Sequence, residues 1–377
     1  MIVIEGAGSA AEMNLRDRDL ANWSAVEMAD ARVVLVADID RGGVFAQVIG
    51  TLDLLAPHER ARVVGIIINK FRGDASLFDD GVRFIEHRTG ILVLGVVPML
   101  RGFRLDQEDA VDIERTGQAQ FAGDRVNIAV VLLPRMSNFT DLNPLMAEPD
   151  VVVRYVEKAA DLNGADVVVL PGSKNTIADF SYVRSSGMAE AICRHAAQGM
   201  EVVGLCGGFQ MLGRSITDPD EVEAGGKVEG LSLLNVSTEF TRTKITQVVE
   251  AESLEIEPAR HLRVRGYFIH MGRTTGQHMR RCFRLCQKNG EIEGAAEGDT
   301  AGMDGAVSDT GMIWGTYLHG VFDRSEFRRA WVNRIRVRKG LPSLPDSVSQ
   351  HTSESLHGQL DRWADHLQSN LKYTSLL

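Results

Sequence analysis

Short apolar runs alternate with amphipathic stretches along the first hundred residues. Three β-branched runs, at residues 32–37, 63–68 and 91–97, are typical of buried parallel strands. Helical periodicity fills residues 46–56 and 76–88 between them. This alternation predicts a doubly wound α/β sheet. The apolar residues 1–4 predict one more buried strand.

A second α/β series follows a stretch without apolar periodicity. That stretch, residues 107–124, is interpreted as a linker, which predicts one domain at residues 1–122 and another at 123–377. Strands of the second domain are predicted at residues 126–133, 166–170, 202–205 and 312–318, with a helix at 189–198 and a β-rich insertion at 231–240, 245–249 and 264–270. Leu356, Leu360, Trp363 and Leu367 recur at helical spacing, so we expect a terminal helix that packs on the body of the protein.

Composition and charge exclude several classes of protein. The chain has 377 residues, 44% of them apolar, which is enough for two separate cores. Its net charge is −10 and it has no basic block, so nucleic acid is not an expected partner. It has neither a long apolar run nor a charged leader, and we expect a cytoplasmic protein without membrane contact. Four cysteines are too few for a disulfide scaffold.

Residues 201–213 carry the most informative motif. A short apolar run ends in Cys206, which is flanked by glycines and followed by an amphipathic run. This pattern predicts a nucleophile elbow, in which a sharp turn presents the thiol at the end of a strand and the start of a helix. Gly204 and Gly208 leave room for such a turn. A free cysteine can equally be a small core residue, so the motif alone leaves both interpretations open.

A histidine at the end of another strand favours the catalytic interpretation. His319 follows the apolar residues 312–318 and precedes a glycine. A cysteine and a histidine at two strand ends, far apart in sequence, are typical of a nucleophile and its base. The turn at Gly172 and Ser173 follows a third strand, so these N–H groups could form an oxyanion hole with that of Gly207. Taken alone, a Pro-Gly sequence after a strand is an ordinary turn.

These motifs resemble the cobyric acid synthase family, in which a class I-like glutamine amidotransferase is fused to a dethiobiotin-synthetase-like ATPase of the P-loop type. The resemblance extends through the segments 5–9, 38–45, 133–141, 170–176, 204–213, 266–272 and 315–322, in the family's order. It implies that Cys206 and His319 act as a catalytic dyad without the glutamate of other class I enzymes, whose position holds Val321. Phe268 stands where the family commonly has glutamate.

The resemblance also implies roles for residues of the first domain. Glu5 matches a magnesium-binding glutamate, and Asn69 with Lys70 matches a nucleotide-binding motif. Asn14, Arg16 and Asp17 resemble a loop that contacts the substrate. Asp38 and Asp40 form a second acidic corner, or else they only cap the next helix.

One motif of the family is missing from this sequence. No G-x-x-x-x-G-K-[ST] loop occurs in the chain, although the family carries a variant of it upstream of the region that begins here at Met1. We therefore expect either a truncated product or a start assigned too late, and weak binding of ATP and Mg²⁺ by this chain alone.

The implied activity is an ATP- and glutamine-dependent amide ligase of cobalamin biosynthesis. Ammonia from glutamine would amidate the b, d, e and g carboxylates of (adenosyl)cobyrinic acid a,c-diamide, the corrinoid substrate. Other corrinoid or cell-wall amidotransferases of the superfamily, a glutaminase-only or non-catalytic remnant, and another cysteine hydrolase are the alternatives. Self-association into a homo-oligomer is left open.

Overall fold

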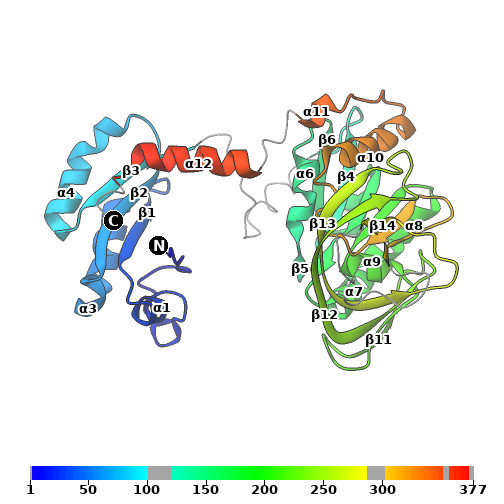
Figure 1. Cartoon of the computed structure of the whole chain (residues 1–377), viewed down its shortest axis with the longest axis horizontal. Coiled ribbons are helices and arrows are strands. Elements are labelled where there is room, and N and C mark those ends of the chain that lie inside the picture. The colour runs from blue at the N-terminus through cyan, green and yellow to red at the C-terminus, as the bar shows by residue number, and fades with distance from the viewer. Residues whose placement is uncertain (1, 101–119, 287–301, 351–355, 373–377) are drawn as a thin grey trace. The chain divides into compact units, whose positions relative to one another are not determined.

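The computed structural model describes residues 2–100, 120–286, 302–350 and 356–372 (Figure 1). The chain forms two compact units. The first combines Met1–Leu105 with Ser355–Leu377, and the second is Asp106–Glu354. Most of the predicted linker lies outside the described residues. The predicted α/β class is confirmed in both units.

The first unit is built on a three-stranded parallel sheet of order β1-β2-β3. Its strands are β1 (Val33–Asp38), β2 (Val63–Phe71) and β3 (Val93–Pro98), and its helices are α1 (Trp23–Met28), α2 (Val44–Leu54), α3 (Pro57–Arg60), α4 (Asp79–Thr89) and α12 (Leu356–Asn370). A 3-10 turn at Arg16–Arg18 precedes α1, and another at Ala75–Phe78 precedes α4. Val48, Ile66 and Ile85 are buried in the core between the helices and the sheet.

One expectation for the first unit is wrong. Ile2, Val3 and Ile4 form no strand, and their side chains are 87%, 82% and 50% exposed. An apolar run becomes a strand only where a neighbouring strand pairs with it, and among the described residues β1 pairs with β2 alone. The terminal helix α12 packs on β3 of the first unit, where Lys372 N donates to Leu94 O over 2.8 Å.

The second unit contains a six-stranded sheet of order β16-β17-β9-β7-β4-β6, parallel except for β16. Its strands are β4 (Val126–Val131), β6 (Val151–Val156), β7 (Val167–Leu170), β9 (Glu201–Leu205), β16 (Ala306–Val307) and β17 (Ile313–Thr316). Helices α6 (Asn143–Met146), α7 (Thr176–Ser185), α8 (Met188–Ala197), α9 (Gly207–Leu212), α10 (Ser325–Arg338) and α11 (Ser347–Gln350) accompany it, with 3-10 turns at Phe139–Leu142 and Ala159–Leu162. All six residues of β4 are buried, as expected for a strand covered on both faces.

The β-rich insertion predicted from the sequence forms a second, largely antiparallel sheet in this unit. Its strands are β10 (Ser215–Asp218), β11 (Gly226–Glu229), β12 (Ser237–Ser253), β13 (Arg263–Thr275), β14 (Phe283–Cys286) and β15 (Met303–Asp304). The long pair of β12 and β13 curves beside the main sheet in Figure 1. A two-stranded ladder of β5 (Met136–Ser137) and β8 (Gly172–Ser173) completes the unit.

In the described part of the chain, no helix is both long and apolar enough to cross a membrane.

Candidate active site

Cys206 lies between β9 and α9, at the carboxyl end of the main sheet. Its φ of 50° and ψ of −107° are unusual for a residue with a side chain, and such a conformation costs about 1–3 kcal/mol. Neighbouring glycines explain how the turn fits. A Cβ atom on Gly208 would lie 1.9 Å from Leu170 O, and one on Gly204 would lie 2.7 Å from the backbone of Gly208. The helix can therefore press against the strand ends and hold Cys206 in this turn.

His319 follows β17, the strand beside β9, and is fully buried. Its Nδ1 donates to Asp141 Oδ2 over 2.7 Å, and the other oxygen of Asp141 accepts a 2.8 Å hydrogen bond from Gly320 N. These two bonds fix the plane of the imidazole. Nε2 is buried and has no hydrogen-bond partner of regular geometry among the described residues. It is thus the nitrogen left for proton transfer.

The pKa of His319 is shifted by opposing effects. Burial alone would lower it, but the hydrogen bond to Asp141 and the interaction with the Cys206 thiol raise the pKa of His319 to about 10. Near neutral pH the ring therefore carries two protons and a positive charge. In this form the ring has a proton on Nε2 that it can give to a leaving group.

Strand β13 lines the same site from the side of the second sheet. Tyr267 exchanges two backbone hydrogen bonds with His319, and their rings stack with centroids 5.2 Å apart. Three residues further along, His270 stacks on Tyr317 at 3.8 Å and packs edge-on against Phe268. Burial lowers the pKa of His270 to about 4, so this ring is neutral near pH 7. Phe268 thus supports His270 by packing where a glutamate would offer a charge.

The oxyanion-hole residues predicted from the sequence lie close to one another and to the ring of His319. A Cβ atom on Gly207 would lie 3.0 Å from Ser173 N, and one on Gly172 would lie 3.6 Å from His319 Cε1. Gly172 and Ser173 belong to β8, whose ladder with β5 is antiparallel. The structure thus brings together all five of the residues predicted for catalysis and the oxyanion hole.

The residues predicted for nucleotide binding meet at the carboxyl end of the first unit's sheet. Asn69 pairs with Asp38 across β2 and β1, and Lys70 Nζ contacts Asp38 Oδ2 at 2.8 Å. The Asn69 side chain accepts from Lys70 N. Glu5 is exposed. Within the described ranges, no group of three or more His, Cys, Asp or Glu is arranged to hold a metal ion.

The predicted substrate loop is dominated by a structural contact. Arg16 pairs with Glu59 and also donates to Leu54 O over 3.3 Å, which ties the loop to α2 and α3. Asn14 and Asp17 are exposed. Arg16 therefore already has partners within its own unit, whereas the side chains of Asn14 and Asp17 make no hydrogen bond or ion pair with other described residues.

Two family models match different parts of the chain. A CobB/CobQ-like glutamine amidotransferase domain matches residues 127–327, and an AAA domain matches residues 1–104. The cobyric acid synthase of Citrobacter koseri is 48% identical over 377 residues, which cover 98% of this chain and 72% of that protein. The cobyric acid synthase of Salmonella choleraesuis is 50% identical over 347 residues, which cover 90% of this chain and 66% of that protein.

The chain belongs to the cobyric acid synthase family. Membership confirms the resemblance carried by the sequence motifs and implies an enzyme that uses ATP and Mg²⁺. Among solved structures, PurLQS from Thermotoga maritima aligns over 63% of this chain and 99% of its own, at 16% identity and a TM-score of 0.37. So distant a likeness adds nothing to the cobyric acid synthase assignment.

Sequence reasoning missed Asp141. It lies in the motif at residues 133–141 that helped to identify the cobyric acid synthase family, yet it received no role there. The 3-10 turn at Phe139–Leu142 brings it to His319, 178 residues further along the chain. The available signal was an acidic residue at the end of a family motif that also holds the polar residues Ser137, Asn138 and Thr140.

Proposed function

We propose that this chain is a cobyric acid synthase whose second unit hydrolyses glutamine and whose product ammonia amidates the b, d, e and g carboxylates of (adenosyl)cobyrinic acid a,c-diamide. The observation that carries the proposal is the buried contact of His319 with Asp141 beside Cys206. The carboxyl end of a parallel sheet is where α/β enzymes of this kind bind ligands.

Glutamine hydrolysis would begin with attack of the Cys206 thiolate on the side-chain amide carbon. His319, positively charged, gives its Nε2 proton to the nitrogen as the C–N bond breaks, and ammonia leaves a thioester on Cys206. The neutral His319 then takes a proton from water, which attacks the thioester and releases glutamate. Asp141 holds the imidazole in place through both steps and stabilises its positive charge.

Ser173 is the better oxyanion donor of the two residues on β8. Lys174 N donates to Arg135 O over 2.9 Å, so this pair is a hydrogen-bonded one of the antiparallel ladder. Because such pairs alternate, Ser173 occupies a non-bonded position with its N–H turned away from β5, whereas Gly172 occupies a bonded one. We therefore assign the hole to the N–H groups of Ser173 and Gly207, and a positioning role beside the His319 ring to Gly172.

The corrinoid half of the reaction requires an activated carboxylate, which ATP supplies in a ligase of this type. At the carboxyl end of β1 and β2, Lys70 is paired with Asp38 and Arg72 with Asp40. These cations are already neutralised, so the described residues form no phosphate cradle and we derive no step through ATP. Glu5, exposed and acidic, is the candidate ligand for Mg²⁺, since an ion held by phosphates needs only one or two carboxylates.

The ion pairs of Lys70 with Asp38 and of Arg72 with Asp40 favour a second candidate function, a glutaminase that makes no amide by itself. The two functions separate in one experiment. Glutamate release is measured with glutamine alone, and amide formation is measured by mass spectrometry with ATP, Mg²⁺ and cobyrinic acid a,c-diamide, beside a full-length relative as positive control. A mass decrease of about 1 Da per converted carboxylate supports the synthase. Glutamate release without amide formation establishes the glutaminase, and the absence of both overturns the two proposals.

A further inference from the structure

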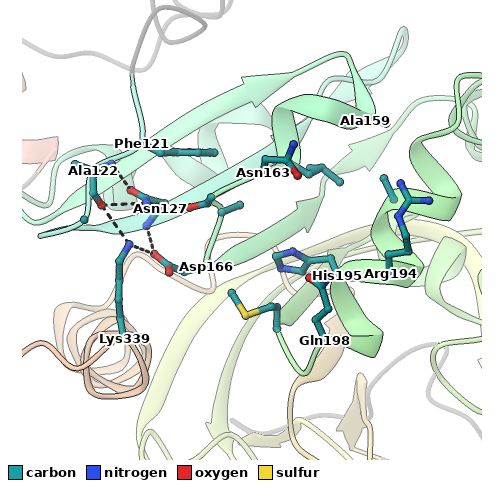
Figure 2. Close-up of a pocket in the computed structure, with 16 residues that line it drawn as sticks. Phe121, Ala122, Asn127, Ala159, Asn163, Asp166, Arg194, His195, Gln198 and Lys339 are labelled. Atoms are coloured by element: carbon teal, nitrogen blue, oxygen red, sulfur yellow. Dashed lines mark hydrogen bonds and ion pairs between the residues drawn. The ribbon is translucent and has the colours of Figure 1, made fainter.

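A cavity of about 540 Å³ opens in the second unit at the amino ends of the strands of the main sheet (Figure 2). Cys206 lies at the other, carboxyl end of these strands. The cavity is lined by residues just before β4, β7 and β9, by the end of α8 and by Lys339 after α10. The size is within the range of small-molecule sites. Met200 of the cavity and Cys206 lie at opposite ends of the five-residue strand β9, which spans roughly 17 Å. The cavity is therefore separate from the glutamine site.

One side of the cavity is held rigid by hydrogen bonds. The side chain of Asn127 bonds to both backbone groups of Ala122 and to Gly164 O, at 3.0–3.1 Å. Asp166 Oδ2 accepts from Asn127 N over 2.8 Å and from Lys339 Nζ over 2.7 Å. These hydrogen bonds fix the shape of this side without a ligand. The charges of Asp166 and Lys339 neutralise each other.

The opposite side offers polar groups that lack partners. Figure 2 shows Arg194, His195 and Gln198 together there, with Asn163 nearby. Among the described residues, no hydrogen bond or ion pair is made by the Arg194 guanidinium or by the side-chain amide of Gln198. His195 is only 7% exposed, and its buried Nε2 has no hydrogen-bond partner of regular geometry in the described part of the chain. Burial lowers the pKa of His195, so near pH 7 the one uncompensated charge of the lining is that of Arg194.

Apolar groups also line the cavity. Phe121, Leu162 and Met200 line the cavity together with several alanines. Phe121 has a guanidinium, that of Arg154, 5.8 Å from its ring centroid. A cavity with a fixed wall, several apolar lining residues and an unpaired cation is suited to a ligand that joins an anionic group to an apolar body.

We propose that this cavity is a second ligand site, which binds a small organic anion with its charged group at Arg194 and its apolar part against Leu162 and Phe121. The anionic group is a carboxylate or a phosphate, because a guanidinium binds the planar oxygens of both. The proposal is independent of the amidotransferase activity, since the cavity shares no residue with the site around Cys206.

The test uses benzoate, phenyl phosphate and the neutral benzamide as probes. Binding of each is measured by ligand-observed NMR and titration calorimetry on the whole chain carrying Cys206→Ala, so that the probes cannot react at the glutamine site. Arg194→Gln is compared with Arg184→Gln, the same change at another exposed arginine, on α7. His195→Gln is a second variant, while Arg194 decides the outcome should that buried change prevent folding.

We expect benzoate or phenyl phosphate to bind at least about tenfold more tightly than benzamide, and Arg194→Gln to remove that advantage. Arg184→Gln should leave it unchanged. The stronger of the two anions identifies the group that the site prefers. Equal affinity for benzamide, an unchanged affinity in Arg194→Gln, or no binding by any probe would each overturn the proposal.

Discussion

Two parallel sheets of this chain carry polar residues at their carboxyl ends, and the two ends differ in burial. In the second unit His319 is fully buried and Asp141 is 4% exposed. In the first unit the side chains of Asp38 and Lys70 are 37% and 48% exposed. Both pairs have short contacts, of 2.7 and 2.8 Å. The two contacts thus have similar lengths but very different surroundings, since one is buried and the other is exposed to water.

That difference decides what each contact can do. Water screens the exposed pair, whose net contribution to stability is expected to be under about 1 kcal/mol. The buried pair is screened far less. Burial lowers the pKa of His319, yet Asp141 together with Cys206 raises this pKa to about 10. The predictions below test this contrast, from the largest expected effect to the smallest.

Cys206→Ala is expected to abolish glutamine hydrolysis and leave the second unit folded. The change removes the nucleophile but retains the backbone turn that Gly204 and Gly208 accommodate. Glutamate release and thermal unfolding by circular dichroism are the measurements. Cys286→Ala, a change at another partly buried cysteine, should keep full activity. Residual hydrolysis by Cys206→Ala would show that another group is the nucleophile.

Asp141→Asn is expected to lower kcat for glutamine hydrolysis by about 10²–10⁴, with a smaller change in KM. The amide cannot accept both the His319 and the Gly320 hydrogen bonds with charge-assisted strength, so the pKa of His319 falls. Asp161→Asn, at a half-buried carboxylate paired with Arg154, is the control. If Asp141→Asn retained the wild-type kcat, the positioning role of Asp141 would be refuted.

The same substitution has a signature in the pH dependence of stability. The pKa of His319 is about 10 in the folded chain against 6.5 for an ordinary histidine. Its stabilising contribution is therefore fully present below about pH 6.5 and is lost as the pH rises through about 10. In Asp141→Asn this loss should occur at lower pH. NMR titration of the His319 ring and melting temperatures from pH 6 to 10 measure both effects.

Glu201→Gln tests the contrast between buried and exposed ion pairs at a charge that lies outside the candidate active site. Glu201 is completely buried and accepts hydrogen bonds from Trp314, Trp331 and Arg338 at 2.7–2.9 Å, and it also pairs with Arg334. Burial raises its pKa, but the two arginines outweigh that effect and hold the pKa below its usual range. Removing this charge leaves two arginines uncompensated.

The expected cost of Glu201→Gln is about 3–5 kcal/mol of unfolding free energy. In a unit of this size that lowers the melting temperature by roughly 6–20 °C. Glu229→Gln, at an exposed position on β11, should change it by less than about 1 °C. A similar small change in both variants would contradict the argument from burial.

Local sequence signals predicted the parts of the site that lie on strand ends. Cys206, His319, Gly172 and Gly207 each follow an apolar run, and a parallel sheet brings such positions to one edge whatever the intervening sequence. Asp141 lies on a short 3-10 turn without periodicity, and only tertiary packing brings it to His319. The amphipathic spacing in α12 likewise predicted a helix with one apolar face, but spacing does not specify which unit that face covers.

Gly95 lies where the end of the chain approaches β3, and it shows why the sequence could not specify which unit α12 covers. A Cβ atom at Gly95 would lie 2.1 Å from Asn370 O, so the close approach of the chain's end to β3 depends on a residue without a side chain. A single glycine in a strand indicates that some backbone comes near. The glycine does not identify the approaching segment, which here lies some 275 residues away in the sequence. The strand predicted at residues 2–4 is absent for a related reason, since an apolar run does not reveal whether another strand is available to pair with it.

Asp38→Asn is expected to have the smallest effect. The exposed contact with Lys70 contributes under about 1 kcal/mol, and the asparagine oxygen can still accept the 2.8 Å hydrogen bond from Asp40 N. Burial raises the pKa of Asp38, but the hydrogen bonds from Lys70 and Asp40 N lower it overall. Its contribution is therefore present above about pH 3.8 and lost as the pH falls further.

Hydrogen exchange of β1 and β2, followed by mass spectrometry, measures this effect without requiring the two units to unfold together. Protection in Asp38→Asn should fall by less than about fivefold, and 1 M salt should remove the difference, because the screening length is then only about 3 Å. A salt-independent loss as large as that expected for Glu201→Gln would mean that the two sheet edges hold their charges in the same way. The contrast between them would then have to rest on something other than exposure to water.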